Sequence, residues 1–315
     1  ARIEGAPEGT KGISLFIVPK IQISQDGSLG SPNDVICTGV EKKMGFHGSP
    51  TCSMSFGSKG QCQGILLGEP NKGMKIMFTM MNQIRLDIGT QGFAAGSVAY
   101  HYALDYAGQR LQGRAIEKLS DNTASQVPII DHPDVRRMLL KMKSYVEGLR
   151  SLIYFTSFCF DKKKFNVSKE ENIRLSNLIE ILTPVVKAYS TERGFDICVE
   201  AMQLFGGYGY TCEYPIEQLL RDSKVTTIYE GTNGIQAMDF LGRKIVGSNG
   251  RMIDDLVKEI KTCINTAKKH DELKSLAEKV EKTVEKLDQV CKKIIDSAMS
   301  KQMRSAFASA HPLLD

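Results

Sequence analysis

The sequence predicts a mainly α-helical protein with a β-rich N-terminal portion. Residues 1 to about 70 are rich in glycine, serine, proline and threonine, and their apolar stretches are short. From Asn71 onward, apolar residues recur every three or four positions over long segments, which is the pattern of one helix face. After residue 250 the composition changes again, to a Lys/Glu-rich segment with regularly spaced apolar residues.

Short strands are expected in the N-terminal portion. The apolar stretches at residues 13–18, 34–40, 51–56 and 62–67 are separated by residues that favour turns. One separating segment, residues 25–34, contains Gly, Ser, Pro, Asn and Asp, so it predicts an exposed hairpin excursion.

Five helices are expected in the following part of the chain. The first would be roughly 50 Å long at 1.5 Å per residue, so it should belong to a bundle or an oligomer interface. Pro133 suits the first turn of the second helix. The predicted helices cover residues 74–106, a segment beginning at Pro133, about 168–205, about 214–222 and 232–246.

The segment after Gly247–Gly250 is expected to form further helices. Its apolar residues follow an approximate heptad rhythm, which implies a partner helix. An appended helical domain is favoured over a free coiled coil, because only about three and a half heptads are present. The predicted domains are therefore residues 1–70, which are β-rich, residues 71–246, which form a helical bundle, and residues 251–315, which are additional helices.

Composition argues against several classes of protein. The net charge of +5 comes from 41 basic and 36 acidic residues, so it gives no reason to invoke nucleic acid or an anionic membrane. The eight cysteines show no metal-binding spacing, and we expect free thiols in a reducing compartment and no metal site. No apolar run reaches the roughly 18 residues of a membrane span, so a soluble, intracellular protein is expected.

Glu230 is the strongest candidate for a catalytic residue. It stands between Tyr229 and Gly231, and Thr232 occupies the position of a helix N-cap. Glycine permits a sharp turn, so the carboxylate should project at the start of a helix, where it can serve as a general base. The alternative is an acid that only complements the helix dipole, and spacing alone does not decide between the two.

Three other features suggest ligand contacts, and each has a structural alternative. The glycines of Gln203–Tyr210 allow close approach of a flat or phosphorylated ligand, but they also suit an ordinary helix stop. Arg110, with Gln112 two residues later, could donate hydrogen bonds from its guanidinium to a phosphate. The structural alternative is an exposed basic residue at the C-terminus of a helix. Arg85 is a charge among apolar residues, so it needs either an internal ion pair or an anionic ligand.

Several separate blocks, in order, resemble the acyl-CoA dehydrogenase family over residues 1 to about 246. The segment from Arg221 to Gln236 is similar to the catalytic signature of that family. The longer subgroup that includes methylmercaptopropionyl-CoA dehydrogenases is the most similar, and it carries extra C-terminal helices like those expected after residue 250. The other matching blocks are Leu15–Lys20, Lys43–Ser49, His47–Cys52, Gly68–Gly73 and Met80–Asn82.

The resemblance implies a fold and a reaction. The fold would be a C-terminal four-helix bundle, preceded by part of a middle β-barrel domain and followed by extra helices. The reaction would be FAD-dependent α,β-dehydrogenation of an acyl-CoA thioester to the trans-2-enoyl-CoA. Glu230 would remove the α-proton while a hydride passes to N5 of FAD, and the thioester carbonyl would accept hydrogen bonds from the Glu230 backbone N–H and a ribityl hydroxyl. Some relatives carry the base at the position of Ile84, which cannot act as one.

The resemblance also assigns further residues. Arg85 is expected beside the CoA end of the site, Tyr229 and Gly231 at the substrate mouth, and Thr232 near the FAD pyrophosphate. A second group is expected to reach the adenosine diphosphate half of FAD on a neighbouring subunit, which implies a homodimer or homotetramer. That group is Arg110, Gln112, Gln203, Gly206 and Gly207.

The chain also departs from the family pattern at several places. Gln112 stands where the family usually has an aromatic residue, and Gly234 stands where it often has a glutamine, so the chain departs from the family pattern on the adenine side. No segment resembles the N-terminal helical domain or the early β domain, and we expect the chain to be a piece of a longer protein, inactive when isolated. An electron-transfer flavoprotein would be the partner.

An acyl-CoA oxidase and a non-catalytic or nucleic-acid-binding flavoprotein relative are the alternatives. The compartment would be bacterial cytoplasm, with the mitochondrial matrix and the peroxisome left open.

Overall fold

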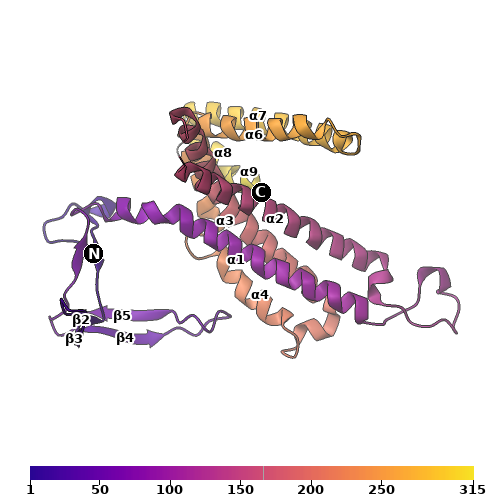
Figure 1. Ribbon diagram of the computed structural model, residues 1–315, viewed down its shortest axis with the longest axis horizontal. Coiled ribbons are helices and arrows are strands. Elements are labelled where there is room, and N and C mark those ends of the chain that lie inside the picture. Colours follow the sequence, from indigo (N-terminus) through magenta and orange to yellow (C-terminus); the bar gives the residue numbers. More distant parts are fainter. Residues whose placement is uncertain (166) are drawn as a thin grey trace. The chain divides into compact units, whose positions relative to one another are not determined.

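The computed structural model describes residues 1–165 and 167–315 (Figure 1). Contacts divide the chain into two compact units, Ala1–Gln83 and Ile84–Asp315, and each unit is described separately below.

The first unit contains three antiparallel two-stranded sheets. The pairs are β1 (Leu15–Ile17) with β6 (Ile65–Leu67), β2 (Ile21–Ile23) with β3 (Leu29–Pro32), and β4 (Val35–Val40) with β5 (Cys52–Phe56). The predicted strands and hairpin excursion are confirmed, and a short 3₁₀ helix, η1 (Gly9–Gly12), precedes them. Many apolar side chains on these strands are exposed, including Ile23, Leu29 and Phe56.

The second unit is helical, which confirms the predicted mainly α fold. Helix α1 (Gly73–Gln109) enters it from the first unit, and the predicted helices follow in order. They are α2 (Pro133–Lys164), α3 (Lys169–Phe205), α4 (Ile216–Lys224), α5 (Asn233–Asp239), α6 (Arg251–Ala267), α7 (Asp271–Met299), α8 (Met303–Ala308) and α9 (Ala310–Leu314). Short 3₁₀ turns connect them: η2 (Ile116–Lys118), η3 (Ile129–Asp131), η4 (Gly206–Tyr210) and η5 (Val225–Thr227).

Local sequence explains where the long helices begin and end. Pro133 occupies the first turn of α2, where its missing N–H is not needed. The Ser168 hydroxyl caps α3 by accepting a hydrogen bond from the Glu171 N–H at 3.2 Å. The same helix stops at Gly206, whose φ of +61° is a conformation that glycine adopts without strain.

The helix predicted over residues 232–246 is correct in extent but not in form. Its first half is α5, whereas its second half, η6 (Phe240–Val246), is a π-helix. The wider turn places the Gly250 N–H 3.0 Å from the Ile245 carbonyl oxygen. Phe307 of α8 packs so closely against Gly242 that a Cβ there would lie 2.9 Å from its ring, a tertiary contact that local sequence does not reveal.

Two large apolar clusters, with a small third one of Leu86, Ile153 and Val186, form the core among the described residues of the second unit. One joins the middle and second half of α1 to α2, the second half of α3 and α4. The other joins the first half of α3 to α5, η6 and the C-terminal helices. The C-terminal helices therefore share a core with the bundle, and α6 and α7 pack side by side as the heptad rhythm implied (Figure 1). Val284, Cys291 and Ile294 of α7 are buried, but Leu273 and Leu276 are exposed.

Helices α1 and α3 meet in direct backbone contact. A Cβ added to Gly194 of α3 would lie 2.1 Å from the carbonyl oxygen of Gly92 on α1. A Cβ on Gly92 would in turn lie 2.7 Å from the Thr191 Cα. The two glycines are therefore what allows the helices to pack this closely.

Among residues 1–165 and 167–315, no helix combines the length and the apolar character that crossing a lipid bilayer demands.

Replacement of Gly194 by alanine is expected to lower the free energy of unfolding by about 1–3 kcal/mol, because α1 and α3 must separate to admit the methyl group. Gly148 is the matched control: it is exposed within α2, and a Cβ there meets nothing within 4 Å. Alanine at position 148 should stabilise the protein by about 0.5–1 kcal/mol. Denaturant unfolding measures both changes, and equal effects at the two positions would contradict the close packing.

Candidate functional site

Glu230 lies at the tip of a turn between η5 and α5. Its φ is +52° and that of Gly231 is +91°, so two successive residues are left-handed. Such a conformation is uncommon for a residue with a side chain and must be held by its surroundings. The glycine and cap predictions are confirmed: Gly231 permits the turn, and the Thr232 hydroxyl accepts a hydrogen bond from the Ile235 N–H at 3.4 Å.

The Glu230 side chain is exposed, as an acting base needs to be. Within the part of the chain that the structure describes, its carboxylate forms no salt bridge, and its backbone N–H donates to no acceptor. The carboxylate remains close enough to the neighbouring ring that its charge, after burial, raises the pKa of Tyr229. The Tyr229 hydroxyl donates a hydrogen bond to Oε1 of Gln91 on α1.

Gln236 of α5 supports the turn through its side-chain amide. Its side chain is buried, and Nε2 lies 3.4 Å from the Glu230 carbonyl oxygen and 3.3 Å from that of Gly231. A Cβ on Gly231 would lie 2.7 Å from the same nitrogen. Glycine is therefore required at position 231 both by its φ and by this contact.

A buried polar network anchors the first residue of α5. Lys187 of α3 is 0% exposed, and its Nζ donates a hydrogen bond to Asn233 Oδ1 at 2.9 Å. Asn233 Nδ2 lies 3.2 Å from the Ala188 carbonyl oxygen, 3.1 Å from Thr191 Oγ1 and 3.2 Å from Glu192 Oε1. Both ends of the Asn233 side-chain amide are therefore tied to α3.

The charge on Lys187 is costly to bury. Burial, and then the nearby charge of Arg85, lower the pKa of Lys187 to about 8. The carboxylates of Glu192 and Glu230 act in the opposite direction and favour the charged ammonium. Lys187 is therefore a buried cation behind the Glu230 turn.

Arg85 is held by an internal ion pair. It is 6% exposed, and Nη1 lies 2.8 Å from Asp239 Oδ2. The other Asp239 oxygen, Oδ1, lies 2.5 Å from Nε of Arg243. Of the two alternatives for Arg85, the structure shows the ion pair, so no anionic ligand is needed to explain its charge.

A cavity of about 550 Å³ lies beside Thr232 and Gly234. Polar and charged side chains line it, including Arg193 of α3, Lys224 of α4 and His311 of α9. His311 Nε2 lies 3.1 Å from Glu192 Oε1, and the Arg193 side chain forms ion pairs with Asp196 and Asp315. Acids and bases are mixed here, so the cavity has no strong preference for one sign of charge.

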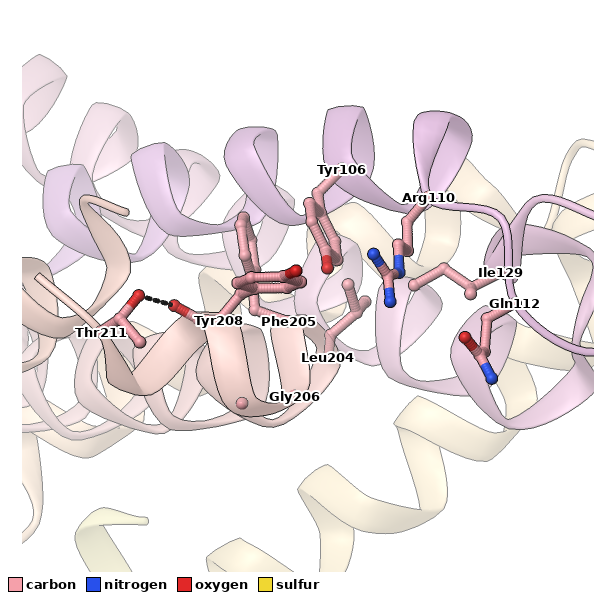
Figure 2. A pocket seen from close by; sticks show the side chains of 10 residues that line it. Tyr106, Arg110, Gln112, Ile129, Leu204, Phe205, Gly206, Tyr208 and Thr211 are labelled. Atoms are coloured by element: carbon pink, nitrogen blue, oxygen red, sulfur yellow. Dashed lines mark hydrogen bonds between the residues drawn. The ribbon is translucent and has the colours of Figure 1, made fainter. Parts of the chain in front are cut away.

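A second cavity, of about 440 Å³, lies where α1 and α3 end (Figure 2). Its lining includes Arg110 and Gln112 after α1, and Gly206, Gly207 and Tyr208 after α3. Figure 2 shows the Arg110 side chain descending from α1 toward the aromatic rings. The guanidinium carbon is 5.3 Å from the Tyr208 ring centroid, within the range of a cation–π contact.

This second cavity, the Arg110 cavity, suits a flat anionic ligand. Arg110 supplies a positive charge, and none of the described residues that line the cavity is acidic. The ring of Tyr106 stacks on Phe205 at 4.1 Å, which fixes one aromatic wall. A Cβ added to Gly206 or Gly207 would meet nothing within 4 Å, so space is open above both backbones. A ligand could approach the main chain closely at this point.

The structure thus brings together four of the five residues predicted for the distal half of the cofactor: Arg110, Gln112, Gly206 and Gly207. Gln203 lies one turn earlier, exposed, and its carbonyl accepts the Gly206 N–H. Tyr229, Glu230 and Gly231 share one turn with Thr232, and Arg85 is held in its ion pair with Asp239.

Sequence reasoning missed Lys187, Asn233 and His311. Lys187 gave a usable signal, because it is a charge within the apolar run Val185–Ala188, as Arg85 is among its own neighbours. His311 gave none, since only the folded chain brings α9 to the cavity beside Thr232. No group of His, Cys, Asp and Glu suited to a metal ion occurs among residues 1–165 and 167–315.

Comparison with known proteins identifies similar sequences and folds. Residues 71–245 match the family model described as acyl-CoA dehydrogenase, C-terminal domain. The chain is 40% identical over 265 residues to a butyryl-CoA dehydrogenase of Syntrophomonas wolfei, covering 82% of this chain and 43% of the relative. It is 39% identical to the 3-methylmercaptopropionyl-CoA dehydrogenase of Ruegeria pomeroyi, covering 80% of this chain and 42% of that protein.

A solved structure shares the fold of almost the whole chain. Caenorhabditis elegans ACDH-11, crystallised in complex with C11-CoA, superposes with a TM-score of 0.83 at 22% identity. The match covers 98% of this chain and 48% of ACDH-11. The chain therefore spans less than half the length of each of these three proteins.

The buried Lys187 charge should make stability depend on pH. Between about pH 8 and the pKa of an unfolded lysine, about 10.4, the unfolded chain binds a proton that the folded chain has lost, so this group makes the folded state more stable as pH rises. Relative to Lys187→Met, the wild-type free energy of unfolding should increase by about 2–3 kcal/mol from about pH 7 to about pH 10. Parallel urea unfolding at the two pH values measures this, and a pH-independent difference would mean that Lys187 titrates normally.

Proposed function

Because the chain belongs to the acyl-CoA dehydrogenase family, we propose that it supplies the base and part of the cofactor site for FAD-dependent dehydrogenation of an acyl-CoA thioester to the trans-2-enoyl-CoA. The observation that carries the proposal is the exposed, unpaired Glu230 carboxylate on a turn braced by buried side chains. The chain spans less than half the length of its relatives, so we propose that it works together with further parts of a longer protein.

Glu230 acts as the general base that removes the α-proton. A carboxylate without a salt bridge keeps its oxygens available for a proton, and the braced turn limits the orientations it can adopt. The unpaired backbone N–H of Glu230 is available as a donor to the thioester carbonyl, where negative charge develops as the proton leaves. One residue thus supplies both the base and one of the stabilising hydrogen bonds. Tyr229 and Gly231, which flank it, line the substrate mouth.

FAD, when bound, accepts the β-hydrogen as a hydride. The Arg110 cavity fits the adenosine diphosphate half of this cofactor, because it combines a cation, aromatic walls and glycines open to close approach. Gln112, which lines this cavity, and Gln203, one turn earlier on α3, would add amide groups, and Thr232 would hold the pyrophosphate of the chain's own cofactor. In the family pattern the Arg110 cavity serves the cofactor of a neighbouring subunit, so we propose a homodimer or homotetramer.

Arg85 is buried and is held in an ion pair with Asp239. Its ion pair with Asp239 accounts for its charge, so the proposal does not depend on contact between Arg85 and the CoA. Placement of Arg85 beside the CoA end remains part of the proposal from the family pattern alone.

An electron-transfer flavoprotein is the proposed electron acceptor, and molecular oxygen, as in an acyl-CoA oxidase, is the alternative. The rate at which the reduced protein is reoxidised in air separates the two: slow reoxidation supports the dehydrogenase, and rapid reoxidation supports the oxidase.

Glu230→Gln in the FAD-loaded protein that carries this chain should abolish bleaching of the flavin by acyl-CoA, with a loss of at least about 10²-fold. The amide retains the size and the backbone N–H but cannot accept the proton. Glu272→Gln, at an exposed acid in the first turn of α7, is the matched control and should bleach at the wild-type rate. Stopped-flow absorbance measures both variants, and unchanged bleaching by Glu230→Gln would remove the assigned base.

Arg110→Lys is expected to weaken FAD binding about 10-fold or more, because an ammonium cannot replace the two-pronged guanidinium or its stacking on Tyr208. Arg150→Lys serves as control, since Arg150 also lies over an aromatic ring, that of Phe93, but away from the Arg110 cavity. Titration calorimetry with FAD measures the affinities. Equal losses in both variants would argue against the Arg110 cavity as a cofactor site.

A further inference from the structure

Lys187 is the most unusual charged group outside the residues assigned above. Its side chain is completely buried, although lysine is almost never fully buried unless it is paired. Within the described part of the chain it forms no salt bridge, and its one hydrogen-bond acceptor is the neutral Asn233 Oδ1. A buried cation so weakly compensated costs stability, so its position calls for a role other than stabilising the fold.

The contacts of Lys187 point to the Glu230 turn. Asn233 is the first residue of α5 and stands three positions after Glu230. Asn233 Oδ1 accepts hydrogen bonds from Lys187 Nζ at 2.9 Å and from the Thr191 hydroxyl at 3.3 Å. Asn233 Nδ2 lies within hydrogen-bond distance of acceptors on Ala188, Thr191 and Glu192. The C-terminal end of the turn is thereby fastened to α3.

A second brace acts within the turn itself. Gln236 donates to the carbonyl oxygens of Glu230 and Gly231, but its own Oε1 is buried without a partner in the described residues. Gln236 therefore orients the peptide groups but is not itself anchored by its oxygen. Asn233, whose oxygen and nitrogen are both bonded to α3, is the firmer of the two attachments.

The charges around Lys187 favour the same conclusion. Arg85 of α1, in its pair with Asp239, repels the ammonium, whereas Glu192 of α3 and Glu230 attract it. Removal of Lys187 would therefore also remove an attraction that draws the Glu230 carboxylate toward α3. Direct chemistry by Lys187 is excluded by its burial, since a substrate could not reach Nζ.

We propose that Lys187 is a positioning residue for the base: through Asn233 and through its charge, it holds the Glu230 turn in the left-handed conformation that proton abstraction requires. This inference rests on the proposed role of Glu230. It predicts that Lys187 lowers the stability of the fold while it raises the rate of the reaction.

The test compares Lys187→Met with wild type in the FAD-loaded protein that carries this chain. Methionine keeps most of the volume, and replacement of a buried charge by an apolar group is often neutral or stabilising. The matched control is Lys244→Met. Lys244 lies on η6, is mostly buried and pairs with Glu180, away from the turn.

Two measurements are made on each variant. Hydrogen exchange of the peptide segment around residues 228–233 reports how firmly the turn is held, and stopped-flow flavin reduction by acyl-CoA gives a rate constant and a half-saturating concentration. Lys187→Met should exchange at least about 10-fold faster in this segment and reduce the flavin about 10- to 100-fold more slowly, because small displacements of a base are costly. The half-saturating concentration should stay within about twofold, and Lys244→Met should match wild type in both measurements.

Each outcome decides the inference. Unchanged exchange and unchanged rate in Lys187→Met overturn it, as does an equal loss in Lys244→Met. Faster exchange with an unchanged rate overturns it as well, and Glu230→Gln then shows whether the proposed base has failed too: if Glu230→Gln is inactive, only the Lys187 role is wrong.

Asn233→Ala provides a second route if Lys187→Met does not fold. It should reproduce the faster exchange and slower reduction, because the same attachment is lost from the other side. Where both variants fold, the double variant should be no slower than the slower single variant, since both changes remove one connection. Full additivity of the two losses would contradict a shared attachment.

Discussion

The Glu230 turn is braced by the buried attachment of Asn233 to α3, in which the Lys187 ammonium donates the shortest hydrogen bond, 2.9 Å to Asn233 Oδ1. A turn with two left-handed residues does not persist by local preference, since only Gly231 adopts such a φ without strain. It must be held from outside, and α3 supplies the hold. Burial of Lys187 costs stability, and in return the turn keeps the Glu230 carboxylate exposed and without a salt bridge among the described residues.

Helix α3 organises both parts of the candidate site. Its middle carries Lys187 toward the Glu230 turn, and its C-terminal end opens at Gly206 onto the Arg110 cavity. The two large apolar clusters of the second unit each take one half of α3, and the contact of Gly194 with Gly92 brings α1 against it. A helix packed on so many sides is rigid, which suits an element that positions both the candidate base and the Arg110 cavity.

The C-terminal helices belong to the same structure as the bundle. They share the apolar cluster of α5 and η6, and His311 of α9 reaches the cavity beside Thr232. Phe307 packs against Gly242 where the chain turns from α-helix to π-helix. The extra helices therefore contribute to the shape of the region next to Thr232, two residues after the candidate base, and the resemblance to the longer subgroup of the family has a structural counterpart here.

By itself the sequence determined the order of strands and helices, the Thr232 cap, the glycine-dependent turn and the candidacy of Glu230 and Arg110, because each follows from periodicity, from backbone preference or from a local motif. The tertiary structure decided which charges are paired. Arg85 and Asp239 are separated by 154 positions, and Lys187 and Asn233 by 46. No local pattern identifies such partners. A charge among apolar residues predicts that a partner exists, but only the packing of α1, α3 and α5 decides which residue that partner is.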